Sequence, residues 1–244
     1  MLNAQKESLV IDSLEDFPVT LPLGEAVYQS LRSSLLNGKL KPGHMLSENM
    51  IASLLRVSRT PVREAINRLQ VEGLVTPIHG RRIIVSIPSH QDIDDVYNIR
   101  LMVEIEALRM ISHDELPVIN QMEIYAQEAK QYLKQNDIVR LGHKNTQFHQ
   151  CLISVLKNRR LEVFLDSLRH VVSMYRFQSL RQGQWAAESW NDHEKLVNLL
   201  KEGSLDPAVD LLKKHLMTAK EILIQLMGTK RQEFQSDVRD LEIT

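Results

Sequence analysis

Four polar side chains interrupt apolar helical stripes in the second half of this 244-residue chain. Asn145 and His149 are four residues apart, so they project from the same face of a helix. His193 and His215 each replace an apolar residue in the stripe of a different segment. Three helices would therefore direct imidazole or amide groups into a shared interior. Three imidazoles with open coordination positions favour a divalent metal ion such as Zn, Ni or Mn.

One inward histidine has a simpler explanation, because core histidines usually satisfy their hydrogen bonds within the protein. A buried polar group without a partner costs a few kcal/mol. Three such histidines together with an inward asparagine need a common partner, which a metal ion provides.

A second cluster of polar residues lies at the start of another predicted helix and suits contact with DNA. Pro61 falls in the first turn, where its missing N–H is not needed, so it starts the helix. Ser58 or Thr60 can cap that helix. The apolar arc holds Val62, Ala65, Ile66 and Leu69, and the opposite arc holds Arg59, Thr60, Arg63 and Asn67. Two forked guanidiniums near a helix N-terminus suit phosphates and guanine edges in a major groove. The alternative is a solvated face with ordinary surface cations.

The segments around this helix predict a winged helix-turn-helix. The stretch GEAVYQSLRSSLLNG has helical apolar spacing and ends at Gly38, and Pro42-Gly43 predicts a turn. Ser47 begins the next helix, which the Arg59 helix follows after a short turn. Two strands, Leu74–Ile78 and Arg82–Ile87, then flank a turn at His79-Gly80 and form the hairpin wing.

This segment resembles the DNA-binding domain of the GntR family of bacterial transcription regulators. The motif VSRTPVREA is Val57–Ala65 without a gap, and EGLV is Glu72–Val75. The resemblance implies that Ser58, Arg59, Thr60 and Arg63 contact DNA and that His79 and Gly80 of the wing reach the minor groove. Asn49 stands where some relatives carry an arginine that reads the operator, so that contact is not carried over.

After Pro88 the pattern is wholly helical, which predicts an all-α bundle. The expected helices cover 90–112, 116–136, Asp137–Leu156, Leu161–Arg181, Trp190–Lys201 and Asp206–Met227. This layout resembles the FadR-type C-terminal domain, called FCD, from about Gln91 to Met227. The fold class is therefore mainly α, with an N-terminal winged helix-turn-helix and a C-terminal FCD-like bundle.

The FCD resemblance implies a metal site at Asn145, His149, His193 and His215. Metal-binding members carry an aspartate where this chain has Asn145. An amide oxygen can ligate a metal but brings no charge, so metal affinity should be lower. The alternative is a metal-free pocket in which the three histidines, as donors, bind an anionic effector directly.

Arg100 matches the arginine of the first bundle helix in that family. It has two interpretations: an i,i+4 surface pair with Glu104, or a cavity residue that binds an effector carboxylate bidentately. Arg176 is a second candidate for the effector site. The predicted effector is a small carboxylate, here an organic acid.

An enzyme is the rival class, because a three-histidine metal site with an open position can activate water. No carboxylate stands where a general base would serve, since Asn145 takes that place. A DNA-binding head also has no use on such an enzyme. A metal sensor is a third hypothesis and differs only in which ligand releases the DNA.

Composition agrees with a cytoplasmic, DNA-binding protein. Cations outnumber anions between Thr20 and Val85, although the formal charge of the whole chain is −1. One cysteine, Cys151, excludes a disulfide framework. Neither a secretory signal nor a run of about 18 apolar residues is present, so we expect no membrane contact.

We expect four parts. Residues 1–20 form an N-terminal extension that is a candidate for disorder, 21–88 the winged helix-turn-helix, 89–228 the effector-binding and dimerisation domain, and 229–244 a charged C-terminal tail. One winged helix buries a small interface, so we expect a homodimer on a palindromic operator of double-stranded DNA.

Overall fold

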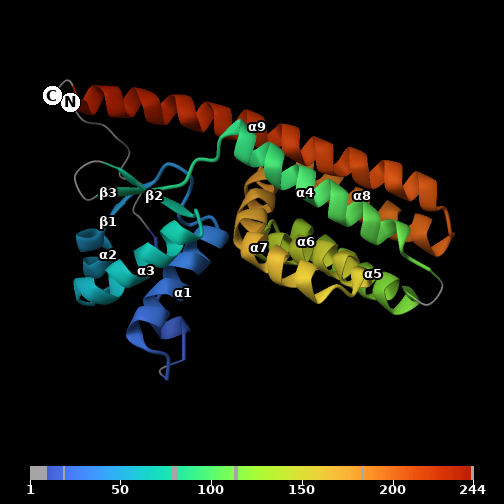
Figure 1. Cartoon of the computed structure of the whole chain (residues 1–244), viewed down its shortest axis with the longest axis horizontal. Coiled ribbons are helices and arrows are strands. Elements are labelled where there is room, and N and C mark those ends of the chain that lie inside the picture. Colours follow the sequence, from blue (N-terminus) through green and yellow to red (C-terminus); the bar gives the residue numbers. More distant parts are fainter. Residues whose placement is uncertain (1–9, 19, 79–81, 113–114, 183, 243–244) are drawn as a thin grey trace. The chain divides into compact units, whose positions relative to one another are not determined.

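The computed structural model describes residues 10–18, 20–78, 82–112, 115–182 and 184–242. It divides into two compact units, Met1–Ile87 with Lys230–Thr244 and Pro88–Thr229 (Figure 1). We describe each unit by itself. None of the helices in the described part of the chain is long and apolar enough to cross a membrane.

The first unit is a winged helix-turn-helix, as the sequence predicted. Its elements are η1 Leu14–Asp16, α1 Leu23–Leu36, β1 Met45–Ser47, α2 Glu48–Leu55, α3 Arg59–Val71, β2 Val75–Ile78 and β3 Arg82–Val85. Ser47 caps α2 by accepting a hydrogen bond from the Met50 N–H at 3.2 Å. The arc of α3 predicted to be apolar is buried: Val62, Ala65, Ile66 and Leu69 are each at most 4% exposed.

The sheet has one strand more than the predicted hairpin. Its order is β1-β3-β2, and both pairs are antiparallel, with Met45 opposite Ile84 and Pro77 opposite Ile83. Gly43, at φ +86°, turns the chain back so that its N–H donates to the Val85 carbonyl at 2.9 Å. The strand β1 has only three residues, too few for an alternating pattern to stand out in the sequence.

Two predicted boundaries differ in the structure. The N-terminal extension is ordered in part, because Asp12 is buried, forms an ion pair with Lys39 and accepts a hydrogen bond from Ser30 through its carbonyl. The last helix was predicted to end at Met227, with a charged tail over 229–244, but α9 covers Leu205–Glu242. The residues after Gly228 include no proline or glycine, and good helix formers such as Lys230 and Glu233 continue the helix.

The second unit is the predicted all-α bundle. Its helices are α4 His90–Arg109, α5 Leu116–Lys134, α6 Ile138–Ile153, η3 Ser154–Leu156, α7 Arg159–Leu180, α8 Trp185–Lys201 and α9 up to Thr229. Helix α8 begins five residues before the predicted Trp190, because Ala186, Ala187 and Glu188 are good helix formers that extend it backwards.

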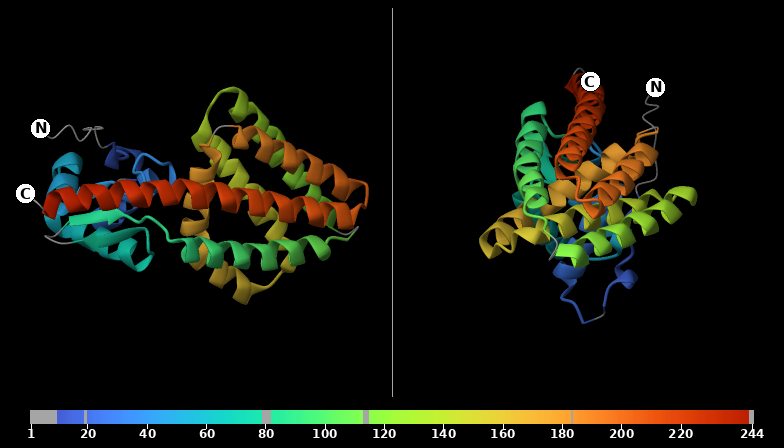
Figure 2. Two further views of the ribbon diagram at one scale, coloured as in Figure 1. Left: turned by 90° about the horizontal axis from the view of Figure 1, so that it is seen from above. Right: turned by 90° about the vertical axis from the view of Figure 1, so that its right-hand side faces the viewer.

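The helices of this bundle pack around one apolar core. α4 lies beside α9 (Figures 1 and 2), and Lys220 bonds Asp94 across that pair at 2.7 Å. Trp190 Nε1 of α8 donates to the Ala126 carbonyl of α5 at 2.9 Å. Phe148, Leu152, Leu196, Val197, Leu212 and Leu216 are among the core residues of α6, α8 and α9. These three helices therefore bring their inward faces together, which is what positions the histidines.

Candidate metal centre and effector cavity

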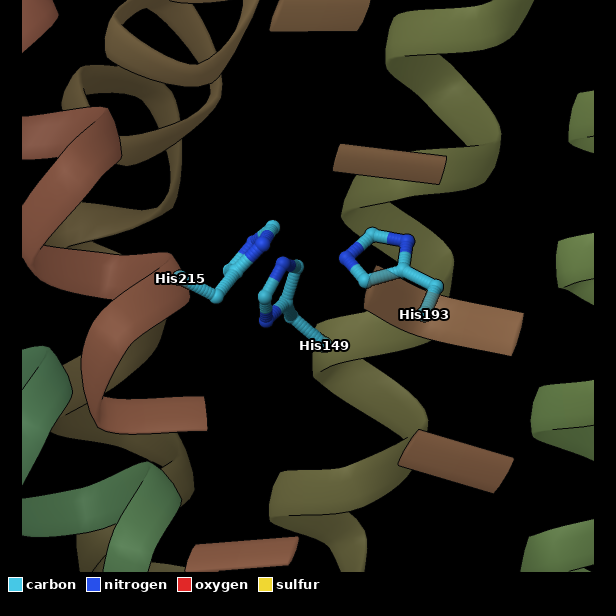
Figure 3. Close-up of side chains that lie close together, drawn as sticks. All are labelled: His149, His193 and His215. Carbon is cyan, nitrogen blue, oxygen red and sulfur yellow. The ribbon is translucent and has the colours of Figure 1, made fainter. Parts of the chain in front are cut away.

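The structure brings His149 of α6, His193 of α8 and His215 of α9 together in the bundle interior (Figure 3). All three side chains are buried, and one nitrogen from each lies within 4.8 Å of the others. The ring centroids are 5.0 Å apart for His149 and His193, and 4.8 Å apart for His193 and His215. Three segments separated by up to 66 positions of sequence therefore meet at one point, as the stripes predicted.

Several atoms around this point have no hydrogen-bond partner among the described residues. They are His149 Nε2, His193 Nε2 and Asn145 Oδ1. Asn145 is also buried, one turn before His149, and its amide nitrogen donates to Ser189 Oγ at 3.3 Å. An unpartnered buried acceptor is costly. Two imidazole nitrogens and an amide oxygen left without partners fit the donor set of a divalent metal ion.

Carboxylates contact the Nδ1 atoms of two of the histidines and so orient their rings. His149 Nδ1 lies 2.6 Å from Glu104 Oε2, and His215 Nδ1 lies 3.3 Å from Asp192 Oδ2. A proton held on Nδ1 by a carboxylate leaves Nε2 free to bind a metal, which is the usual arrangement behind ligating histidines. The Asp192 contact is the longer and weaker of the two.

Burial keeps the three imidazoles neutral. It lowers the pKa of His149 to about 3, even though Glu104 acts in the opposite direction. Burial, reinforced by the neighbouring imidazoles, holds the pKa of His193 well below its usual range. Burial also lowers the pKa of His215. Neutral imidazole is the form that ligates metals, whereas the metal-free alternative requires protonated histidines.

Glu104 connects this cluster to both candidate effector residues. Its Oε1 accepts from Arg100 Nε at 2.9 Å and from Arg176 at 3.3 Å. Glu104 is fully buried, and Arg100 and Arg176 are each 5% exposed. The hypothesis of a surface pair between Arg100 and Glu104 is therefore wrong. Both residues also lie in the inward-facing stripe of this helix, because Tyr97, Arg100, Glu104 and Leu108 follow one another at helical spacing.

Burial and neighbouring charges have opposing effects on the pKa of Glu104. Burial raises the pKa of Glu104, but Arg100, His149 and Arg176 outweigh burial, so its pKa lies well below the usual range. Burial, with Arg100 nearby, lowers the pKa of Arg176 to about 9. Glu104 is therefore an anion that compensates a buried cationic environment.

Arg100 and Arg176 separate two spaces in the bundle. One is a small pocket of about 10 Å³ beside Asn145, His149, His215 and Trp185. This is about the volume needed to hold one water molecule. The other is a larger cavity of about 290 Å³, bordered by α4, α6 and α7. Both arginines border both spaces. The sequence placed the arginines as effector candidates, but it did not show the two spaces.

The predicted DNA-contacting residues lie on the exposed face of α3. Ser58, Arg59, Thr60 and Arg63 are exposed, and Ser58 occupies the N-cap position without a side-chain cap bond. Glu48 accepts from both arginines, from Arg59 Nη2 at 2.9 Å and from Arg63 Nε at 3.1 Å. One carboxylate thus holds the two guanidiniums side by side. His79 and Gly80 lie outside the described residues.

Comparisons with known proteins match both units. Residues 23–85 match the model of bacterial regulatory proteins of the gntR family, and residues 95–218 match the FCD domain. The chain is 24% identical to YdhC of Bacillus subtilis, an uncharacterized HTH-type transcriptional regulator, over 80% of this chain and 89% of that one. It is 25% identical to the gluconate operon transcriptional repressor of the same organism, over 65% of each chain. A solved GntR structure from Rhodococcus sp. RHA1 shares the fold with a TM-score of 0.70 at 23% identity, over 83% of this chain and 97% of that one.

Proposed function

Because the chain belongs to the GntR family of bacterial regulatory proteins and carries an FCD domain, we propose that a small carboxylate effector and a divalent metal ion in its helical unit control operator binding. The chain is a transcription regulator of the helix-turn-helix type. Its family and its relatives are regulators, which confirms the prediction that it is not an enzyme.

The observation that carries the metal proposal is the set of unpartnered acceptors at the three-histidine cluster. Asn145, His149, His193 and His215 would hold the ion. The bound ion would supply a Lewis-acidic centre that attracts an anionic ligand. The chain's own residues orient the imidazoles through Glu104 and Asp192 and keep them neutral by burial.

The arginines support an organic effector over a plain metal sensor. A sensor needs only the ion, whereas this bundle also keeps two buried guanidiniums beside a cavity of about 290 Å³. Guanidinium forks bind carboxylates bidentately. The metal-free alternative is weaker, because burial lowers the pKa of all three histidines and so disfavours the protonated form.

The operator proposal rests on the exposed arginines of α3. Ser58, Arg59, Thr60 and Arg63, together with His79 and Gly80 of the wing, would contact DNA. Two copies of the chain, joined through the helical unit, would bind the two halves of a palindrome in the cytoplasm. Light scattering should therefore report a dimer at micromolar concentration. A monomer that binds its operator tightly would contradict this.

Two measurements test the proposal on protein purified without chelators. Elemental analysis and native mass spectrometry should find a divalent metal and a retained small acid. Operators selected from random duplexes should then be titrated in fluorescence anisotropy with metal alone, acid alone and both. A response that needs both supports the proposal. A full response to metal alone indicates a metal sensor. No response to metal or acid would contradict the proposal that this site regulates DNA binding.

A further inference from the structure

The cavity of about 290 Å³ between α4, α6 and α7 is lined mainly by aliphatic side chains. Val96, Ile99 and Val103 come from α4, Ile153 from α6, and Leu168 and Val172 from α7. The polar residues of this lining differ in burial. Arg100, Glu104 and Arg176 are buried, whereas Ser154 and Glu162 are exposed. The cavity therefore extends from a charged interior, along an aliphatic wall, to solvent.

Two donors of the cavity lining have no acceptor among the described residues. Arg176 Nε and Thr146 Oγ1 border the cavity, and neither has a hydrogen-bond partner among the described residues. Buried N–H and O–H groups are rarely left without partners. A carboxylate placed there would accept from the Arg176 guanidinium and from the Thr146 hydroxyl.

The charges at this end sum to one excess positive charge. Arg100 and Arg176 are cations, and Glu104, which bonds both, is the single anion among these buried groups. An uncompensated buried charge is unfavourable. A carboxylate beside Arg176 offsets part of this positive charge, to which the proposed divalent ion at His149 would add.

From this aliphatic lining and the two unpartnered donors, which suit one carboxylate, we infer that the effector is an amphipathic monocarboxylate with an aliphatic or aromatic body. Its carboxylate binds at Arg176 and Thr146, and its body lies along Val103, Leu168 and Val172. A cavity of about 150 Å³ can hold one benzene molecule, which has six carbons. The cavity here has about twice that volume, about 290 Å³, so it suits a ligand body of roughly eight to twelve carbons. A polyhydroxylated acid would leave its hydroxyl groups against aliphatic walls without partners. This inference rests on the proposed function, because it specifies the carboxylate which that function requires.

A chain-length series tests the class of ligand on the full-length protein. Calorimetric titrations at neutral pH would use acetate, butanoate, hexanoate, octanoate, gluconate and the neutral octanamide. Each added methylene should strengthen binding by about three- to fourfold until the cavity is full. Gluconate and octanamide should each bind at least about tenfold more weakly than octanoate, since one lacks an apolar body and the other lacks the charge.

Two variants locate the ligand within the bundle. Val172→Trp fills the aliphatic part, so octanoate should lose about tenfold or more in affinity while acetate stays within about twofold. Its control is Val163→Trp, on the exposed side of the same helix, where Val163 is 66% exposed. Arg176→Leu removes the excess charge, so octanoate should lose about tenfold or more while octanamide is unchanged.

The outcomes separate this inference from the function it rests on. Gluconate binding as tightly as octanoate, with no gain along the series, overturns the apolar class but leaves a carboxylate-controlled regulator standing. Failure of every acid to bind at millimolar concentration overturns both. If Val172→Trp does not fold, the series on the unchanged protein still decides the class.

Discussion

His149 Nδ1 lies 2.6 Å from Glu104 Oε2, and both groups are fully buried. The carboxylate is ionised, because the cations around it outweigh the effect of burial on its pKa. It therefore accepts the Nδ1–H of a neutral imidazole, and the lone pair of Nε2 points away from it. This pair decides which nitrogen of His149 can bind a metal.

Replacing Glu104 tests that relationship. Glu104→Gln keeps the shape of the side chain but removes the anion behind His149, so metal affinity should fall by about 10–100-fold. The two arginines also lose their counter-charge, so the free energy of unfolding should fall by about 3–5 kcal/mol. Calorimetry with zinc, nickel and manganese and urea unfolding measure the two effects. Glu106→Gln, exposed on the same helix, is the control. A folded Glu104→Gln protein with full metal affinity would show that the carboxylate does not orient a ligand.

Asn145→Asp tests the composition of the metal site. It adds a charged oxygen one turn before His149, and Coulomb attraction in a partly dry interior favours a cation there, so metal affinity should rise. His193→Ala should abolish binding. Titration of both variants with zinc, nickel and manganese measures these changes. Unchanged or lower affinity in Asn145→Asp would mean that residue 145 is not a ligand.

The buried histidines should make stability depend on pH in a defined direction. Burial lowers the pKa of His149 to about 3, while an unfolded chain has a histidine pKa of about 6.5. The unfolded state thus binds more protons between these values, so the free energy of unfolding falls as pH drops from about 6.5 towards 3. Urea unfolding of metal-free protein across this range measures the slope.

The slope should lessen in His149→Gln and persist in His143→Gln, because His143 is exposed on the same helix. An equal slope in the two variants would assign the pH dependence to other groups. Metal must be absent from these samples, since ligation itself competes with protons.

Arg59 separates base recognition from phosphate contact. Arg59→Ala should cost about 1–3 kcal/mol of operator binding and relax specificity at one base step. Arg59→Lys keeps the charge but not the fork, so it should lose most of the same specificity. Fluorescence anisotropy with specific and scrambled duplexes measures both quantities. Equal losses on the two duplexes in Arg59→Ala, with full binding in Arg59→Lys, would limit this residue to a phosphate.

Periodicity placed most of the fold, because long helices repeat their apolar residues many times. It located α4 to α7 within a few residues and turned Asn145, His149, His193 and His215 inward. Apolar periodicity did not locate the short strand or the polar end of the last helix. The strand β1 depends on pairing with β3, and the end of α9 carries no apolar stripe that marks a boundary.

The contacts of Glu104 in the candidate site could not be predicted from the sequence either. The sequence left Arg100 and Glu104 open between a surface pair and a cavity position, because the i,i+4 spacing of opposite charges fits both. Its contact with His149 joins residues 45 positions apart, and its contact with Arg176 joins residues 72 apart. Such contacts depend on how α4, α6 and α7 pack. Asp192, by contrast, directly precedes a predicted ligand and could have been considered.

The three partners of Glu104 also limit how this protein can evolve. A change at Glu104 alone leaves two buried guanidiniums without an anion, whereas a change at His193 removes one proposed metal ligand and no counter-charge. A lineage that gives up the proposed metal site can therefore lose its histidines one at a time. Glu104 can change only together with Arg100 and Arg176, so the three should be inherited as a set and outlast the cluster beside them.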